Sequence, residues 1–200
     1  MGIGNLSRAG WTLALRFPRR PASADWACSV TLSELRASAN PRPGGWHLFP
    51  PPYQQMAPTL EECELLYALI RATRPARVLE LGTGMGVTGC FIAEALRENG
   101  DGGTLLTIEP KRQFWPDAQE LLLGLPASIS ATTDGLDLEP DLVFVDSGYE
   151  YRAADIREWL SNGYGGPVLV HDAERRYPEL ERGCGVFLAS TSGLWIGRGA

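Results

Sequence analysis

The sequence predicts an α/β domain built on a doubly wound, mostly parallel seven-stranded sheet that ends in an antiparallel hairpin. Residues 77–96 combine a short apolar strand, a glycine turn and an amphipathic helix. From residue 75 onward, short apolar runs alternate with helical patterns, which indicates a parallel sheet with helices on both faces. Two further apolar runs, joined by a turn at 191–193, close the chain as a hairpin.

The first expected element is a helix that begins after Thr59, because Thr59-Leu60-Glu61-Glu62 has the pattern of a capping box. The parallel strands share short runs of apolar residues and are expected at 77–81, 104–108, about 127–131, 141–145 and 167–171. The helices between them share apolar residues at helical spacing and are expected near 86–98, 111–123 and 150–161. The hairpin strands are expected at 186–189 and 194–197, so any helix before them must be short.

Length and composition limit the class of protein. The chain has 200 residues, of which 44% are hydrophobic, enough for one domain with a sizeable core. We expect residues 1–55 to form an N-terminal arm with a proline- and aromatic-rich lid segment, and residues 56–200 to form the domain. No apolar run is long enough to span a membrane, and the four cysteines lack C-x-x-C spacing. These features predict a cytoplasmic protein with reduced thiols.

Charge is distributed unevenly along the chain. Residues 1–42 carry six Arg against two acids, a net charge of +4, which leaves −10 for the remainder of a chain with a net charge of −6. Nucleic-acid phosphates require a basic surface, so the acidic body argues against a nucleic-acid partner. Only the basic arm keeps RNA open as a substrate.

The turn after the first strand is the strongest indication of a ligand. Its glycines, Gly82, Gly84 and Gly86, permit positive φ angles and close approach of the backbone, and the helix that follows offers free amides. Glu80 precedes this turn, and its carboxylate would repel a pyrophosphate but suits the ammonium or sulfonium group of S-adenosylmethionine. Glu109 follows the second strand, where an acid can accept both ribose hydroxyls.

These motifs carry a family resemblance. The stretch V-L-E-L-G-T-G-M-G at 78–86, followed by L-T-I-E-P at 106–110, resembles motif I and its acidic partner in class I S-adenosylmethionine-dependent methyltransferases. The resemblance implies a Rossmann-like sheet and S-adenosylmethionine as the cofactor. The residues that it implies for cofactor binding are Glu80, Gly82, Gly84, Glu109 and Asp134. Asp134 resembles the acid that meets the adenine amino group, although a simple Asp-Gly turn also explains it.

Polar residues also end the fourth and fifth strands. Asp146 follows the fourth strand, and His171 and Asp172 end the fifth, so the three side chains should converge at the carboxyl edge of the sheet. Two carboxylates and an imidazole can hold a hard divalent cation, which would lower the pKa of a substrate hydroxyl. In catechol and caffeoyl-CoA O-methyltransferases, which the chain resembles, Asp146 and Asp172 match the positions of Mg²⁺ ligands. His171 then serves as a third ligand or as a general base.

The chain departs from the related antibiotic-tailoring branch, which includes cephalosporin-hydroxylase-like and macrolide-sugar methyltransferases. Where that branch often reads D-G-D-H-S-Y-E, this chain reads D-S-G-Y-E from Asp146, so Tyr149 replaces a histidine that can act as base. We expect Tyr149 to orient the substrate or to pack against its neighbours. His171 is the remaining candidate base, with a purely structural histidine as the alternative.

The sequence therefore predicts an S-adenosylmethionine-dependent methyltransferase that methylates a hydroxyl group of a small molecule, with Mg²⁺ as a candidate second cofactor. Two alternatives stay open: methylation of RNA or protein, and a catalytically silent cofactor-binding partner subunit. The oligomeric state is open as well, a homodimer included.

Overall fold

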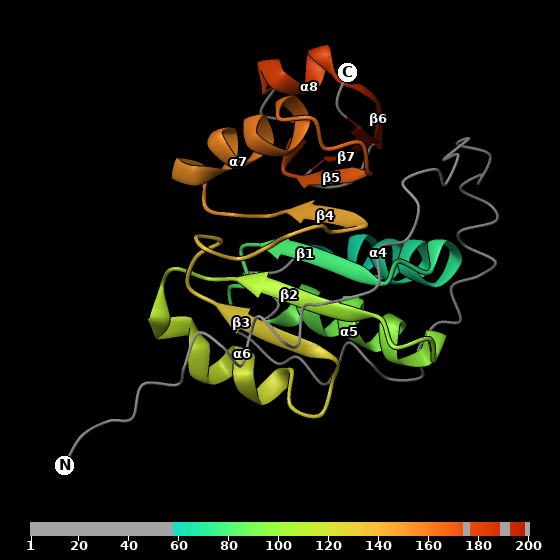
Figure 1. Ribbon diagram of the computed structural model, residues 1–200, viewed down its shortest axis with the longest axis vertical. Helices are drawn as coiled ribbons and strands as arrows, with labels where there is room; N and C mark the ends of the chain where they lie inside the picture. Colours follow the sequence, from blue (N-terminus) through green and yellow to red (C-terminus); the bar gives the residue numbers. More distant parts are fainter. Residues whose placement is uncertain (1–57, 174–176, 189–192, 199–200) are drawn as a thin grey trace.

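The computed structural model describes residues 58–173, 177–188 and 193–198, in which a seven-stranded sheet is flanked by helices (Figure 1). The strands are β1 (Arg77–Leu81), β2 (Thr104–Ile108), β3 (Ala127–Ser130), β4 (Leu142–Val145), β5 (Val168–His171), β6 (Cys184–Leu188) and β7 (Leu194–Arg198). Their order is β3-β2-β1-β4-β5-β7-β6. The first five run parallel, whereas β7 is antiparallel to both β5 and β6. The predicted fold class is confirmed.

The helices fall between the strands as the alternating pattern predicts. They are α4 (Leu60–Thr73), α5 (Val87–Asn99), η2 (Arg112–Phe114), α6 (Trp115–Leu121), α7 (Tyr149–Ser161) and α8 (Pro178–Arg182). The region expected as one helix near 111–123 instead opens with the 3-10 turn η2, and Pro116 lies in the first turn of α6, where its missing amide costs nothing. The helix before the hairpin is short, as expected.

The core has two apolar layers because successive strand residues face opposite sides of the sheet. The layer on the side of α4 and α5 includes Val78, Leu105, Phe144, Leu169, Ile70 and Ile92. The layer on the side of α7 and α8 includes Leu79, Leu106, Val143, Val170, Ile156 and Leu180. This burial on both faces fixes the positions of the strand ends that carry the polar residues.

Helix α4 begins with the predicted capping box. The Thr59 amide donates to Glu62 Oε2 at 2.7 Å, and the Glu62 amide donates to Thr59 Oγ1 at 3.4 Å. The pair satisfies two of the free amides at the helix start. It also fixes the side chain of Glu62, which is 2% exposed and reaches the candidate site.

Strand order reverses between β1 and β4, which places a crevice outside their carboxyl ends. Gly82, directly after β1, has φ +101°, and a Cβ there would lie 2.3 Å from the carbonyl oxygen of Asp146. Only glycine allows the two chain segments to pass so closely.

The predicted arm and lid at 1–55 lie outside the described residues. In the part of the chain that the structure describes, no helix is long and apolar enough to cross a membrane.

Candidate active site

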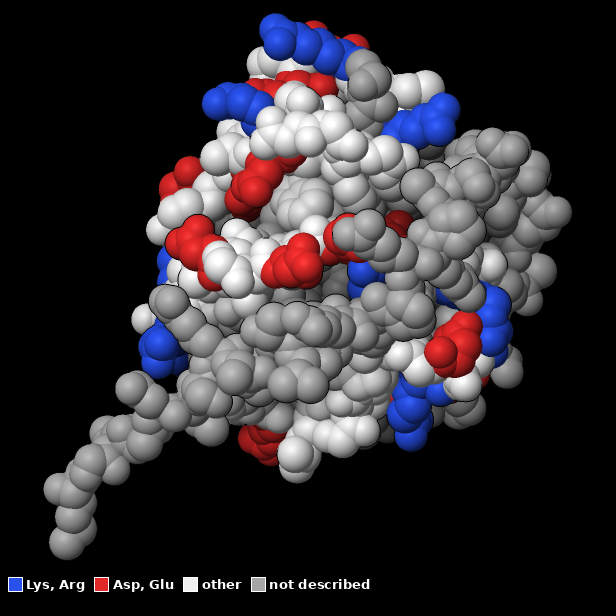
Figure 2. Space-filling model, viewed as in Figure 1, with Lys and Arg blue, Asp and Glu red and all other residues white. Residues whose placement is uncertain are grey.

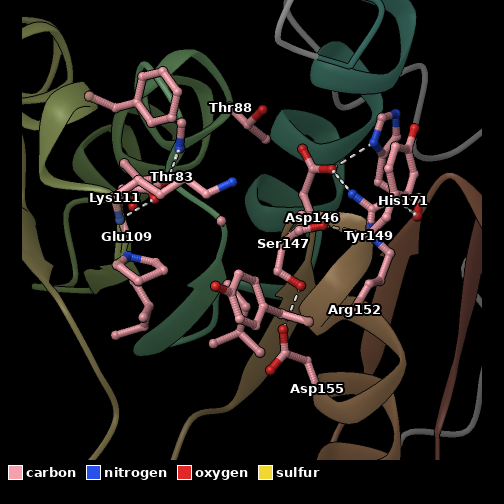
Figure 3. Close-up of a pocket in the computed structure, with 18 of the residues that line it drawn as sticks. Thr83, Thr88, Glu109, Lys111, Asp146, Ser147, Tyr149, Arg152, Asp155 and His171 are labelled. Atoms are coloured by element: carbon pink, nitrogen blue, oxygen red, sulfur yellow. Dashed lines mark hydrogen bonds and ion pairs between the residues drawn. The ribbon is translucent and has the colours of Figure 1, made fainter.

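A cavity of about 720 Å³ opens at the carboxyl ends of β1, β2, β4 and β5. Figure 3 shows Glu109 and Lys111 on one side of it and Asp146, Arg152 and His171 on the other. The acids of its wall are Glu109, Asp146, Asp155 and Asp172, and the basic residues are Lys111, Arg152 and His171. The wall therefore carries four acidic and three basic side chains.

The glycine turn forms one wall of the cavity. The amides of Gly82 and Thr83 donate to the carbonyl of Ile108, at 2.9 and 3.2 Å, and tie the turn to the end of β2. The Thr83 hydroxyl bonds that of Thr107 at 2.6 Å. Gly84 has φ +51° and open space where a Cβ would stand, so the backbone is exposed to the cavity at this point.

Glu109 lies in the wall beside this turn, where the sequence places it. Its carboxylate accepts hydrogen bonds from the amides of Gly84, at 2.9 Å, and Lys111, at 2.8 Å. The Trp115 indole donates to the Glu109 carbonyl at 2.9 Å and fixes the backbone. The carboxylate is thus held against the glycine turn, 5% exposed and ready to accept hydroxyl donors.

Glu80 lies under the turn and outside the cavity wall. It is fully buried and accepts a hydrogen bond from Thr107 at 2.5 Å, while its Oε1 has no hydrogen-bond partner among the described residues. Burial is the largest cause that raises its pKa, to about 8, and the charges of Asp146 and Glu109 add to the effect. A Cβ at Gly89 would lie 2.9 Å from the carboxylate, so this glycine makes room for it.

Asp134 is exposed in the turn after β3 and is not part of the cavity wall. Its amide donates to Thr132 Oγ1 at 3.0 Å. Thr132 and Thr133, its neighbours, do line the cavity. A contact of Asp134 with adenine stays a prediction.

Asp146, His171 and Asp172 meet at the opposite wall, as the strand order requires. Each offers a ligand atom within 4.8 Å of the others. Arg152, from the first turns of α7, lies between the two acids: it donates to Asp146 Oδ1 at 2.9 Å and to Asp172 Oδ2 at 2.6 Å. Asp172 has φ +55°, a left-handed conformation that Asp tolerates better than most residues.

Both ring nitrogens of His171 face carboxylates. Nδ1 lies 2.8 Å from Asp146 Oδ1, and Nε2 lies 3.4 Å from Glu62 Oε2. Burial lowers the pKa of His171, but the hydrogen bonds and charges of these acids outweigh it and raise the pKa to about 10. Burial also raises the pKa of Asp146, but with His171 and Arg152 in contact we assign it the ionised form. The imidazole therefore donates to Asp146 at neutral pH.

Tyr149 begins α7 and is 51% exposed. Its ring lies over the Arg152 guanidinium, 5.1 Å from centroid to Cζ. Burial raises the pKa of Asp172, but hydrogen bonds from Arg152 and Tyr149 and nearby positive charges lower it below its usual range. Tyr149 thus packs against the cluster and lines the cavity as well.

The sequence interpretation missed Arg152 and Glu62 as members of the cluster. Arg152 had a signal: together with Ile156 and Leu160 it forms the buried stripe of α7, at a spacing of four residues. A charge within an apolar stripe indicates a buried ion pair. The sequence around Glu62 indicates only its capping role, because no local sequence pattern shows that α4 packs beside the end of β5.

The cavity-forming region matches a known family. Residues 79–173, from β1 to the residue pair after β5, match the family model of a methyltransferase domain. Residues 79–173 are thus similar to a methyltransferase domain. The matched region contains Glu80, Glu109, Asp146, Arg152 and Asp172, so both walls of the cavity lie within it.

Known proteins extend this finding. A protein of Mycobacterium sp. (strain JLS) named "Putative O-methyltransferase" is 30% identical over 123 residues, which cover 54% of each chain. The chain thus spans about half the length of the curated relative that it matches. Methyltransferase PaMTH1 of Podospora anserina, solved with S-adenosylhomocysteine, has a TM-score of 0.66 at 14% identity, covering 92% of this chain and 100% of its own.

A second solved structure, the O-methyltransferase TomG of Streptomyces achromogenes in complex with S-adenosylmethionine, has a TM-score of 0.58 at 21% identity, with coverage of 85% of this chain and 92% of its own. At these identities, the solved structures show the fold alone, which this chain shares with them.

Proposed function

We propose that this protein transfers a methyl group from S-adenosylmethionine to a hydroxyl oxygen of a small molecule. The observation that carries the proposal is the single cavity that joins the glycine turn and Glu109 on one side to the Asp146 cluster on the other. The names of the similar proteins, several of which are O-methyltransferases, support the reaction type.

The residues of one wall fit the cofactor. The Glu109 carboxylate can accept hydrogen bonds from the two ribose hydroxyls in place of those from the amides of Gly84 and Lys111. The open space at Gly84 allows the cofactor to approach the backbone closely. The acids of the wall favour a cofactor that carries a positive sulfur. Glu80 would support the turn from beneath, through Thr107 and Thr83, without touching the ligand.

The residues of the other wall fit the acceptor. When bound, S-adenosylmethionine supplies a methyl group on a positively charged sulfur. Asp146 accepts a hydrogen bond from the acceptor hydroxyl and takes its proton as the oxygen gains the methyl group and the carbon–sulfur bond breaks. His171 holds Asp146 in place from behind, because both of its ring nitrogens are already directed at acids. This assigns the base to Asp146 and a positioning role to His171.

Magnesium is not part of this proposal. The resemblance places the ion between Asp146 and Asp172, but the Arg152 guanidinium bridges these carboxylates, so the set does not fit a divalent cation in this arrangement. A cytoplasmic location, a homodimer and a lid at 1–55 stay predictions of the sequence.

Charge favours a small acceptor over a nucleic acid. Among the described residues on the face in Figure 2, several acidic side chains lie across the middle of the view, and most Lys and Arg lie in separate groups toward its edges. The four acids of the cavity wall outnumber its three basic residues, so the wall offers no net positive charge to a phosphate backbone.

The cofactor assignment is tested by titrating S-adenosylhomocysteine into the full chain in a calorimeter. We expect wild type to bind and Glu109→Gln to bind on the order of tenfold more weakly, because a hydrogen bond to a charged group is lost. Glu120→Gln removes an exposed carboxylate of α6 outside the wall and should leave the affinity unchanged. No binding by wild type, or equal affinities in both variants, would refute the assignment.

The acceptor side is tested with Asp146→Asn and a panel of small phenols, alcohols and hydroxy acids, followed by transfer of a labelled methyl group. We expect turnover to fall on the order of a hundredfold while S-adenosylhomocysteine still binds, because the proton acceptor is lost. Asp137→Asn, an exposed carboxylate outside the cavity, is the matched control. Cofactor binding by wild type without turnover on any acceptor would instead favour the catalytically silent partner.

A further inference from the structure

Three ligand atoms from Asp146, His171 and Asp172 lie within 4.8 Å of one another, the arrangement expected of a cation site at the end of β4 and β5. A hard divalent ion would need these atoms free, because Mg²⁺ binds oxygen at about 2.0–2.1 Å in a nearly ideal octahedron. The atoms are already bound to protein groups. Asp146 Oδ1 accepts hydrogen bonds from His171 Nδ1, at 2.8 Å, and from Arg152, at 2.9 Å.

Arg152 reaches the second acid in the same way. Its guanidinium donates to Asp172 Oδ2 at 2.6 Å while another of its nitrogens bonds Asp146, so one planar cation bridges the two carboxylates. The bridge supplies positive charge at the point where two negative side chains approach each other. Without a cation there, the two partly buried acids would repel one another.

The guanidinium is anchored and has little freedom to move aside. Its Nε donates to the Ser147 carbonyl at 2.8 Å, and a further N–H donates to the His171 carbonyl at 3.2 Å. The side chain is 3% exposed, and the Tyr149 ring covers it. Burial lowers the pKa of Arg152, but the neighbouring acids more than offset this and raise it, so the charge is permanent.

From this geometry we infer that Arg152 is the resident cation of the Asp146–His171–Asp172 cluster and that the cluster holds no divalent metal. Arg152 acts as a positioning residue: it orients Asp146 toward the cavity and neutralises part of its charge. A second cation of charge +2 would have to displace four hydrogen bonds of a buried guanidinium. This inference depends on the proposed function in one respect, which is that the methyl acceptor binds beside this cluster.

The test uses Mn²⁺ as a paramagnetic probe, titrated into the full chain loaded with S-adenosylhomocysteine and followed by electron paramagnetic resonance. We expect wild type to show no specific Mn²⁺ binding. Arg152→Gln should free the carboxylates and bind Mn²⁺ on the order of tenfold or more tightly than wild type. Adding Asp172→Asn to this variant should abolish the gain. Arg157→Gln removes an exposed arginine from the same helix and should behave as wild type.

If wild type binds Mn²⁺ specifically and Asp172→Asn does not, the inference is overturned, whatever the result for Arg152→Gln. A folded Arg152→Gln protein that gains no affinity would overturn it too, because something other than Arg152 would then exclude the ion. Circular dichroism reports whether that variant folds. If it does not, Arg152→Lys keeps the charge, and Mn²⁺ binding by this variant would contradict the inference while its absence would support it. Mn²⁺ binding is measured without turnover, so a negative result here does not refute the proposed function. The calorimetric titration of S-adenosylhomocysteine tests that function separately.

Discussion

A single buried carboxylate, Glu80, couples the stability of the domain to pH. It lies in β1 with no exposed surface, and only one of its oxygens has a hydrogen-bond donor, Thr107, among the described residues. Removal from water favours the protonated acid, which raises its pKa from 4.5 to about 8. Between these two values the folded chain keeps a proton that the unfolded chain releases. The free energy of unfolding must therefore fall as pH rises through this range.

Glu80→Gln tests this coupling, because glutamine copies the shape of the protonated acid and cannot ionise. We expect wild type to lose on the order of a few kcal/mol of unfolding free energy from this group between about pH 5 and 8, and Glu80→Gln to lack that loss. Urea unfolding followed by tryptophan fluorescence at several pH values measures it. Glu120→Gln, at an exposed site, should keep the wild-type slope. Parallel curves for wild type and Glu80→Gln would contradict the assigned pKa.

At this scale, the sequence predicted residue positions better than residue partners. Glu109 and Asp146 stand at strand ends in the cavity wall because buried strands have fixed length and direction. The alternation of side chains along β1 directs Glu80 toward α5, beneath the turn, and its contact with the ligand stays a prediction. The partners of Arg152 could not be predicted, because they lie 6 and 20 residues away in the chain.

At the scale of elements, local signals predicted most boundaries. The capping box at Thr59 marks the start of α4 through side-chain hydrogen bonds, and the glycine turn marks the start of α5 through the backbone bond from Gly86 to Thr83. The segment 111–123 was less regular than predicted because η2 winds tightly before α6 begins. Helix α7 shows how an element carries function: its buried stripe delivers Arg152 to the cluster and Ile156 to the core.

At the scale of the whole molecule, the sheet order explains why the cavity lies where it does. The chain builds the sheet outward from β1 to β3 and then returns to place β4 on the other side of β1. The loops after β1 and β4 consequently diverge and leave a crevice between them. The alternating pattern predicted a parallel sheet with helices on both faces, but it contained no information on how closely the two loops approach.

At Gly82 the end of β1 passes close to the chain that follows β4, so a methyl group there should disturb both stability and ligand binding. Its φ is +101°, and the added Cβ of Gly82→Ala would lie 2.3 Å from the Asp146 carbonyl oxygen. We expect the free energy of unfolding to fall by about 2 kcal/mol or more, the cost of the backbone conformation plus the clash. Affinity for S-adenosylhomocysteine should fall with it.

The matched control is Gly84→Ala, in the same turn, because Gly84 also has positive φ, at +51°, but nothing within 4 Å of the added Cβ. Urea unfolding should place Gly84→Ala between wild type and Gly82→Ala, since it bears only the backbone cost. Calorimetric titration then shows whether affinity follows the same order. Equal stability of the two variants would mean that the loop after β4 moves away from β1 at little cost. In that case, the conformations of the two loops would determine the width of the cavity, and the short distance between Gly82 and the Asp146 carbonyl would not.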